Sequence, residues 1–140
     1  MVYAIKTRVP DPDADSFTFV AQKTMYGGKR IAQGDTIFVI SSENGGGTGL
    51  VAKGIVAAVD AVQRRPGVER QTPRVTVHVT RIAGAVKRLG RSELKPFTSW
   101  DDGRPETELN FKFYRQATDK IAGISDATAA FLAGYFDGEE

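Results

Sequence analysis

The 140-residue sequence contains no cysteine and only one histidine, His78. The lack of cysteine excludes disulfides, zinc–thiolate sites and cysteine nucleophiles. A single histidine cannot supply a histidine-rich metal site. Asp101 and Asp102 could together bind a metal, but an Asp-Asp-Gly turn explains this pair better. The sequence therefore predicts no metal site and no cofactor.

Long apolar runs are also missing. None approaches the roughly 20 residues that a helix needs to span a bilayer. The N-terminus does not show the basic-then-apolar pattern of a signal peptide, so a cytoplasmic location is expected. The length suits one domain with its own core. We expect a single domain over residues 1–140, with a frayed acidic tail at residues 136–140.

No catalytic motif is complete, and we expect no catalytic residue, although an enzymatic activity stays open. No serine and aspartate are spaced with His78 as a triad would require, and a hydrogen-bonded surface role for His78 is favoured. A G-x-G-x-x-A match begins at Gly47 and could open a dinucleotide site if residues 50–62 were helical. The β-branched residues of that segment and Gly54 disfavour a helix. A hairpin loop is the preferred interpretation.

The clearest structural signal is a pair of apolar runs on either side of a glycine cluster. The turn Gly34-Asp35 precedes the run Ile37–Ile40, which is rich in β-branched and aromatic residues and typical of a buried strand. A second apolar run covers residues 50–59. The sequence therefore predicts two strands joined by the Gly45–Gly49 loop.

Alternating patterns extend this prediction to the rest of the chain. Residues 73–80 place Val75, Val77 and Val79 on one face, and residues 109–116 alternate in the same way. A first strand is expected near residues 2–5, and residues 16–24 fit either a strand or a short helix. Ser125 can cap a terminal helix. Together these elements predict a mainly β (α+β) fold, a small barrel of five or six strands with short helices and a C-terminal helix.

Positive charge is concentrated in one window. Residues 64–95 contain nine basic and two acidic residues, a net charge of +7, whereas the whole chain carries +2 and the remainder −5. Such a block suggests an anionic partner, although a solvated surface would explain it equally well. The residues predicted to contact phosphates are Arg64, Arg65, Arg88, Arg91 and Lys29.

Aromatic and polar residues suggest a second kind of contact. Trp100, the only tryptophan, lies in a predicted loop, and Tyr114 and Arg115 lie where a predicted strand ends. Unstacked bases are held by aromatic rings and by hydrogen bonds from arginine, serine and asparagine. Alternatively, Trp100 covers an end of the barrel. The residues predicted to line a ligand cleft are Ser41, Ser42, Asn44, Trp100, Tyr114 and Arg115.

The central segment resembles the PUA-like superfamily, and its EVE and ASCH-type members most of all. The resemblance rests on Gly-Asp-Thr-Ile-Phe-Val-Ile-Ser-Ser at residues 34–42, a glycine turn, and Gly-Leu-Val-Ala-Lys-Gly-Ile-Val at residues 49–56. It implies a PUA-type barrel with a cleft that receives RNA or a modified base in relatives. Two features depart from the pattern. Tyr3 stands near the place of a first-strand tryptophan common in EVE members, and only residues 28–30 echo the ASCH signature.

Taken together, these observations favour a binding module for RNA, DNA or a modified nucleobase, which it would hold as a single strand or a flipped base. Two alternatives stay open. One is a small enzyme acting on a nucleotide-like substrate, with the Gly45–Gly49 loop near its phosphates. The other is an interaction domain without a small ligand.

Overall fold

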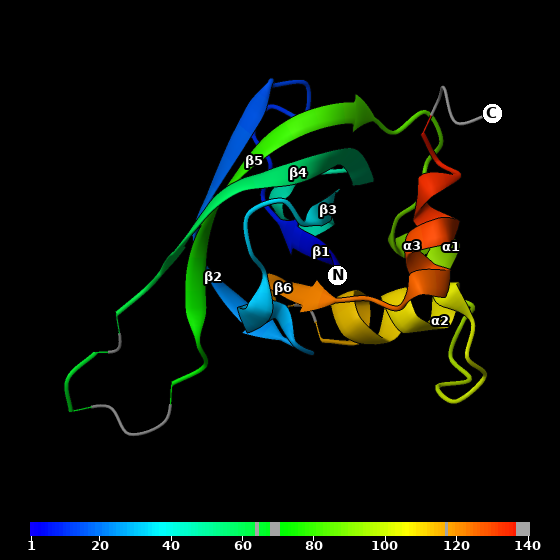
Figure 1. The fold of residues 1–140 in the computed structure, drawn as a ribbon. Helices are drawn as coiled ribbons and strands as arrows, with labels where there is room; N and C mark the ends of the chain where they lie inside the picture. Colours follow the sequence, from blue (N-terminus) through cyan, green and yellow to red (C-terminus); the bar gives the residue numbers. More distant parts are fainter. Residues whose placement is uncertain (64, 68–70, 117, 137–140) are drawn as a thin grey trace.

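The computed structural model describes residues 1–63, 65–67, 71–116 and 118–136. Six strands close into a barrel in the spatial order β1-β3-β4-β5-β2-β6, and β6 pairs again with β1 (Figure 1). The predicted barrel of five or six strands is therefore confirmed. The strands are β1 (Val2–Thr7), β2 (Ser16–Met25), β3 (Thr36–Ser41), β4 (Gly49–Ala61), β5 (Arg74–Gly84) and β6 (Lys120–Gly123).

Short helices accompany the barrel. Helices α1, α2 and α3 lie together on one side of it (Figure 1). None of the helices in the described part of the chain is long and apolar enough to cross a membrane. The helical segments are the 3-10 turns η1 (Gly28–Arg30) and η2 (Glu43–Gly45), the α-helices α1 (Arg91–Leu94), α2 (Pro105–Leu109) and α3 (Asp126–Ala133), and the π-helix η3 (Asn110–Arg115).

The predicted strand pair around the glycine loop is the antiparallel hairpin β3–β4. The middle of β3, Ile37–Ile40, is apolar because both faces of the strand are buried there. Ile37 and Val39 point into the barrel, whereas Phe38 and Ile40 pack toward the helices. Residues 49–61 form a strand, so the helix required by a dinucleotide site is absent from this segment. The preference for a hairpin loop is confirmed.

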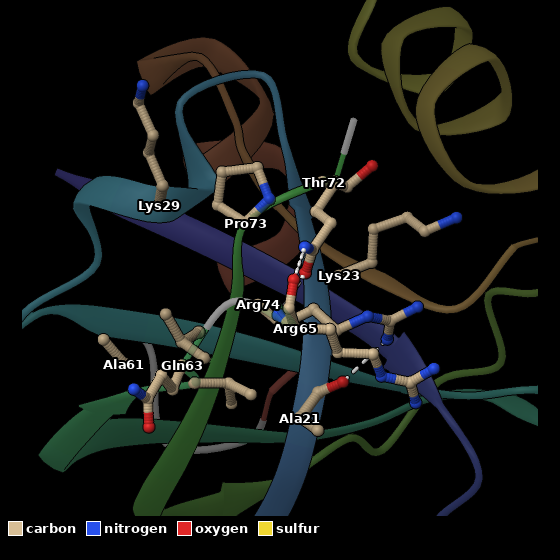
Figure 2. A pocket seen from close by; sticks show the side chains of 12 residues that line it. Ala21, Lys23, Lys29, Ala61, Gln63, Arg65, Thr72, Pro73 and Arg74 are labelled. Atoms are coloured by element: carbon tan, nitrogen blue, oxygen red, sulfur yellow. Dashed lines mark hydrogen bonds between the residues drawn. The ribbon is translucent and has the colours of Figure 1, made fainter. Parts of the chain in front are cut away.

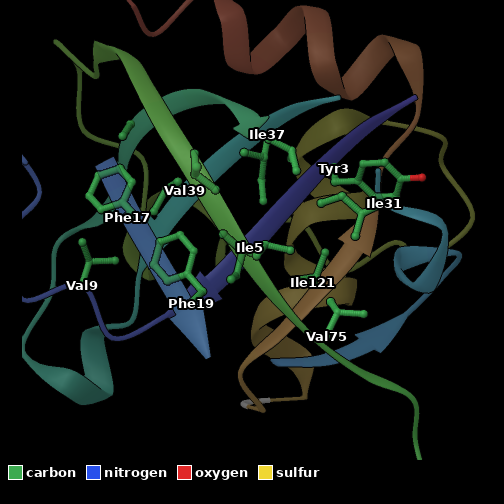
Figure 3. Packing of buried hydrophobic residues seen from close by; sticks show 14 residues of the cluster. Tyr3, Ile5, Val9, Phe17, Phe19, Ile31, Ile37, Val39, Val75 and Ile121 are labelled. Carbon is green, nitrogen blue, oxygen red and sulfur yellow. The ribbon is translucent and has the colours of Figure 1, made fainter. Parts of the chain in front are cut away.

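Two apolar clusters hold the fold. The first fills the barrel, where Figure 3 shows side chains from several strands converging, and includes the predicted face of Val75, Val77 and Val79. The second lies between the barrel wall and the helices and includes Phe113 and Leu132. Alternate residues of one strand contribute to each cluster, as the period of two in a strand requires.

The prediction of a strand over residues 109–116 is wrong. These residues continue α2 as the π-helix η3. Pro105 occupies the first turn of α2, a position that suits its fixed φ angle. Leu109 and Phe113 are both fully buried, and a spacing of four residues shares a face in a helix as well as in a strand. The alternation therefore could not distinguish the two structures.

The C-terminal part agrees with the prediction except at one residue. The hydroxyl of Ser125 accepts a hydrogen bond from the N–H of Thr128 at 3.2 Å and so caps α3, as predicted. Phe136 is buried and forms a β-bridge with Ala85, so it does not belong to a frayed tail. Residues 137–140 lie outside the described residues.

Strands β4 and β5 are the longest in the barrel, with 13 and 11 residues. Figure 1 shows that they continue beyond the barrel as a two-stranded ribbon, on the side away from the helices. Their outer ends are exposed, in contrast to the buried middle of both strands. The ribbon carries part of the basic block away from the helical side of the molecule.

Candidate nucleic-acid interface

Two adjoining cavities lie along the outside of the barrel. The first, of about 830 Å³, lies between β2 and the outer part of the β4–β5 ribbon (Figure 2). The second, of about 520 Å³, lies at the ends of β1 and β3 and the start of β6. Lys23 and Arg74 line both cavities and so join them. We refer to the two joined cavities as the basic groove.

The basic groove is strongly positive. Asp119 is the one acidic residue among its described lining residues. No ion pair found among the described residues includes a basic residue of the groove, whereas Arg81, Arg88, Arg104 and Lys112 each pair with a carboxylate. The basic lining residues are Arg8, Lys23, Lys29, Arg65 and Arg74.

The side chains of the first cavity have a common direction. Figure 2 shows Lys23, Arg65 and Arg74 directed to one side of the cavity, whereas Lys29 points the other way. A guanidinium nitrogen of Arg74 donates to the carbonyl of Ala21 at 2.8 Å, which fixes this side chain against β2. The remaining guanidinium donors of Arg74 are available to an anion.

The strand pairing brings like charges together. Lys6 of β1 faces Lys120 of β6, and Lys23 of β2 faces Arg74 of β5. Strands β2 and β6 run parallel, with Thr24 beside Ile121, so Lys23 lies next to Lys120. We refer to Lys6, Lys120, Lys23 and Arg74 as the cation row. It crosses four neighbouring strands, and like charges placed directly opposite each other destabilise a sheet.

The two lysines at the inner end of the cation row are fully buried, with 0 % exposure each. Lys6 Nζ donates to the carbonyl oxygen of Phe113 at 2.9 Å. Lys120 Nζ donates to the carbonyl oxygens of Gln116 and Thr118 at 3.2 and 3.3 Å. These carbonyls lie at and just after the end of the α2–η3 helix, where backbone oxygens carry partial negative charge. The lysines therefore hold the C-terminal end of this helix against the barrel.

Burial changes the titration of both lysines. Burial, followed by the charges of Lys6 and Lys23, lowers the pKa of Lys120 to about 8, although Asp119 acts in the opposite direction. Burial also lowers the pKa of Lys6, against the opposing effects of Asp119 and Glu43. The charged forms are thus costly here, because they lack water and have few carboxylates nearby.

Ser42 and Asn44, two of the predicted cleft residues, line the second cavity. Ser41 lies buried behind them, where its side chain contacts Gly47 so closely that a Cβ at Gly47 would collide with it. Glu43 fixes the loop between them, because its carboxylate accepts the N–H of Arg91 at 2.7 Å. Ser42 and Asn44, with the adjacent Gly45, are therefore the residues of this loop that can face a ligand in the cavity.

Tyr114 was predicted to line a ligand cleft, but it lines neither cavity. Its side chain is buried, and its hydroxyl donates to Glu43 at 3.0 Å. Lys6 Nζ and the Arg91 guanidinium lie 5.0 and 5.5 Å from the ring centre. Burial, with the charge of Glu43, raises the pKa of the Tyr114 hydroxyl. Tyr114 thus connects the loop of Glu43 to the helical layer.

Trp100 and Arg115 lie together but line neither cavity. Trp100 is 42 % exposed, and the Arg115 guanidinium lies 5.2 Å from its ring centre. Phe111 contacts Trp100 edge-on at 5.5 Å and Tyr26 at 6.3 Å. Tyr26, itself 40 % exposed, lies in the turn that leads to Lys29. We refer to Tyr26, Trp100, Phe111 and Arg115 as the aromatic patch.

The predicted phosphate-binding residues do not lie at a single site. Lys29 and Arg65 line the first cavity. Arg88 forms an ion pair with Glu93, with Nε and Oε2 3.4 Å apart. Arg91 covers the ring of Tyr114. Arg64 lies outside the described residues.

Sequence reasoning missed three residues of the groove, namely Arg8, Lys23 and Arg74, as specific contacts. Arg74 belongs to the basic window but shows no feature that separates it from its neighbours, and Lys23 lies in a segment with an ambiguous pattern. A possible signal is a basic residue at the end of a strand, since Arg8 follows β1 directly and Arg74 begins β5. Their convergence depends on the barrel register, which no local pattern contains.

The remaining candidates for chemistry have structural explanations. His78 Nδ1 and Nε2 lie 3.2 Å from Thr18 Oγ1 and from Asp60 Oδ2, in agreement with the hydrogen-bonded role predicted for it. Asp102 accepts from the N–H of Arg104 at 2.9 Å and from the hydroxyl of Thr107 at 3.0 Å, as in a turn. Over the described ranges, no group of three histidine, cysteine, aspartate or glutamate residues could hold a metal ion.

No protein-family description matches the sequence, and no curated protein matches it in sequence. Solved structures do match the fold. The DUF55 domain of human thymocyte nuclear protein 1 is similar over 96 % of this chain and 97 % of its own, with a TM-score of 0.61 and 10 % identity. A protein from Pseudomonas putida is similar over 96 % and 99 %, with a TM-score of 0.57 and 11 % identity. Human THYN1 in complex with DNA containing 5-methylcytosine is similar over 99 % of both chains, with a TM-score of 0.54 and 13 % identity.

These likenesses concern the fold, since the identities are low. The DUF55 domain is an EVE-type domain with a PUA-like fold, and the match extends over nearly the whole of this chain. The closed six-stranded barrel, the short helices and the C-terminal helix together match a small PUA-like barrel. The chain therefore has the PUA-like barrel fold that its central segment predicted.

Proposed function

We propose that this protein binds nucleic acid along the basic groove, and that it takes a single strand or a flipped base. The observation that carries the proposal is the convergence of basic side chains without carboxylate partners among the described residues. Within it, Lys23 lies directly opposite Arg74. A sheet position that places two like charges face to face is unfavourable unless an anion lies between them. Backbone phosphates supply such anions at regular spacing.

The fold supports the same function from an independent direction. Human THYN1, which shares this fold, is known in complex with DNA containing 5-methylcytosine. We therefore include a modified nucleobase among the proposed ligands. RNA and DNA strands of one sequence, compared in the same binding assay, would decide between the two nucleic acids.

The second cavity suits a base or nucleotide better than a duplex. Its volume of about 520 Å³ falls within the range of small-molecule pockets. The hydroxyl of Ser42 and the amide of Asn44 line it and can bond the polar edge of a base. For the aromatic patch we propose stacking of a further base on Trp100, with Arg115 beside it, as single-strand binding proteins do.

The test is the affinity of a fluorescent single-stranded oligonucleotide, measured by anisotropy over a series of salt concentrations. Replacement of Lys23 or Arg74 by alanine should weaken binding to all sequences. Each variant should also reduce the salt slope by roughly 0.7 for every phosphate that the protein no longer neutralises. Arg104→Ala, which removes an exposed arginine paired with Glu106, should change neither quantity. Unchanged affinity and slope in both groove variants would reject the proposal.

A further inference from the structure

The buried end of the cation row lies against the second cavity. Lys120 directly follows Thr118 and Asp119, which line that cavity, and Lys6 lies two residues before Arg8, which also lines it. Thr7, between Lys6 and Arg8, donates its hydroxyl to Asp119 at 3.4 Å. Two buried ammonium groups therefore lie behind a cavity whose own lining is already positive.

The hydrogen bonds of the lysines do not balance their charge. Lys6 and Lys120 donate to main-chain carbonyls, which carry only partial charges. None of the ion pairs within the described ranges includes either lysine. A helix end needs donors at its carbonyls, but neutral side chains or water could supply them. Helix capping thus explains where the lysines point, but neither ammonium group has a carboxylate within ion-pair distance among the described residues.

The positive row stops at this end. On the next strand, β3, Lys6 faces the apolar Ile40. Glu43 follows β3, and its carboxylate accepts hydrogen bonds from the hydroxyl of Tyr114 and the N–H of Arg91. Glu43 also acts on the titration of Lys6, which shows that the two groups are electrostatically close. Glu43 lines neither cavity, so its carboxylate, like the Lys6 ammonium, lies behind the wall of the groove. The row of basic residues therefore ends beside the second cavity, where Asp119 is the one acidic residue among the described lining residues.

We propose that the second cavity binds a phosphate monoester, either the terminal phosphate of a nucleic-acid strand or that of a mononucleotide. This inference rests on the proposed function and specifies its ligand. The direct contacts are Arg8, Lys23 and Arg74, with the hydroxyl of Ser42 and the amide of Asn44. The ammonium groups of Lys6 and Lys120 act through the field behind the cavity wall.

A monoester fits this site better than an internal phosphodiester. It carries between −1.5 and −2 charges near neutral pH, whereas a diester carries one. Three basic side chains line the cavity and two more lie behind it, against the single carboxylate of Asp119. The doubly charged group compensates about half of this excess, roughly twice as much as a diester does.

The bound anion would also change the protonation of Lys120. Its pKa is about 8 in the free protein, and the charged groups that act on it are Lys6, Lys23 and Asp119. A nearby dianion favours the charged ammonium and raises this pKa. Binding at about pH 8.5 should therefore take up protons from the buffer, since Lys120 is largely neutral above a pKa of about 8. A ligand without a terminal phosphate should cause less uptake.

The experiment is titration calorimetry of the full chain at about pH 8.5, chosen to lie above the Lys120 pKa of about 8, in two buffers of different ionisation enthalpy. The ligands are one single-stranded oligonucleotide with a 5′-phosphate, with a 3′-phosphate or with neither, and a nucleoside monophosphate. We expect a phosphorylated strand to bind at least about tenfold more tightly than the unphosphorylated strand, the effect of one or two charge-assisted hydrogen bonds. Equal binding by the monophosphate would assign the site to mononucleotides.

Two variants make the result specific. Arg8→Ala should remove the preference for the phosphorylated ligand, and Arg104→Ala should keep it. Lys120→Met should remove the proton uptake; if that variant does not fold, the Arg8 comparison still decides. Equal affinities for phosphorylated and unphosphorylated strands would overturn the monoester site and leave groove binding intact. Absence of binding by every strand and by the monophosphate would overturn the proposed function as well.

Discussion

The buried Lys120 gives an unusual dependence of stability on pH. Its pKa is about 8 in the folded protein, against an ordinary value of 10.5. Between these values the unfolded chain binds more protons than the folded protein, so the free energy of unfolding rises with pH. The gain is absent below pH 8 and complete above the unfolded value. Most surface lysines would contribute nothing in this window.

The size of the effect follows from the two pKa values. A difference of one pKa unit corresponds to about 1.4 kcal/mol, so the full gain is roughly 3 kcal/mol and most of it is reached by about pH 10. For a chain of this length, that corresponds to an increase in melting temperature of about 6–12 °C. Lys6 contributes with the same sign, because its pKa is lowered too. Tyr3, Tyr114 and Tyr135 act in the opposite direction from about pH 9, because their pKa values are raised from 10.0 and the unfolded chain loses these protons first.

The assay is urea unfolding at intervals from about pH 7 to about pH 9, where few tyrosines of the unfolded chain are ionised. The parent protein should gain roughly 1–2 kcal/mol over this range, and Lys120→Met should lose most of that gain. Lys95→Met removes an exposed lysine and should keep it. The reasoning is refuted if parent and Lys120→Met show the same slope, or if the stability of the parent falls steadily over this range.

Three further predictions concern other parts of the molecule. Glu108 accepts hydrogen bonds from Lys112, Ser125 and Thr128, and Glu108→Ala should lower the free energy of unfolding by about 2–4 kcal/mol in urea. Burial acts to raise the pKa of Glu108 but these partners lower it on balance, so its contribution should be lost as pH falls below the ordinary value of 4.5. Oligonucleotides should quench the fluorescence of Trp100 in the parent protein, and Trp100→Ala should weaken binding about tenfold, if a base stacks there. A lower melting temperature of Trp100→Ala with no quenching in the parent would leave Trp100 a packing residue. Gly49→Ala should cost clearly more stability than Gly46→Ala, because both have positive φ but a Cβ at Gly49 would also collide with the backbone of Leu89. Equal losses in these two variants would show that the backbone strain alone matters.

Sequence reasoning predicted well those elements whose residue pattern is compatible with a strand and not with a helix. A run such as Ile37–Ile40, bounded by a turn and by serines, is too short for a buried helix and is buried on both sides. The β-branched residues of β4 decided between strand and helix in the same way. The strand prediction for residues 109–116 was wrong because residues four apart lie on the same face in a helix and in a strand. Strand β6 has only four residues and begins with a lysine, so nothing in it alternates.

The candidate site was predictable only where single residues reveal their position. Ser42, Asn44 and Lys29 follow strands or occupy turns, where side chains face solvent and ligands. They indeed lie on the cavities, as does Arg65. The cation row was not predictable, because its members come from β1, β2, β5 and β6 and meet only when the barrel closes in this register. The distance between Trp100 and the cavities depends on the same closure.

The cation row lowers the stability of the barrel, so stability alone does not explain its presence. Apolar residues at Lys6 and Lys120 would fill the same space without desolvating two charges, and replacements of buried charges are often neutral or stabilising. The like-charge pairs across β1–β6 and β2–β5 add repulsion to that cost. An anion in the groove reverses both effects, because it supplies the missing counterion and raises the lysine pKa values toward their ordinary range. The proposed function therefore predicts that anion binding and folding stability are coupled through the same four residues, since a ligand that binds only the folded protein stabilises it.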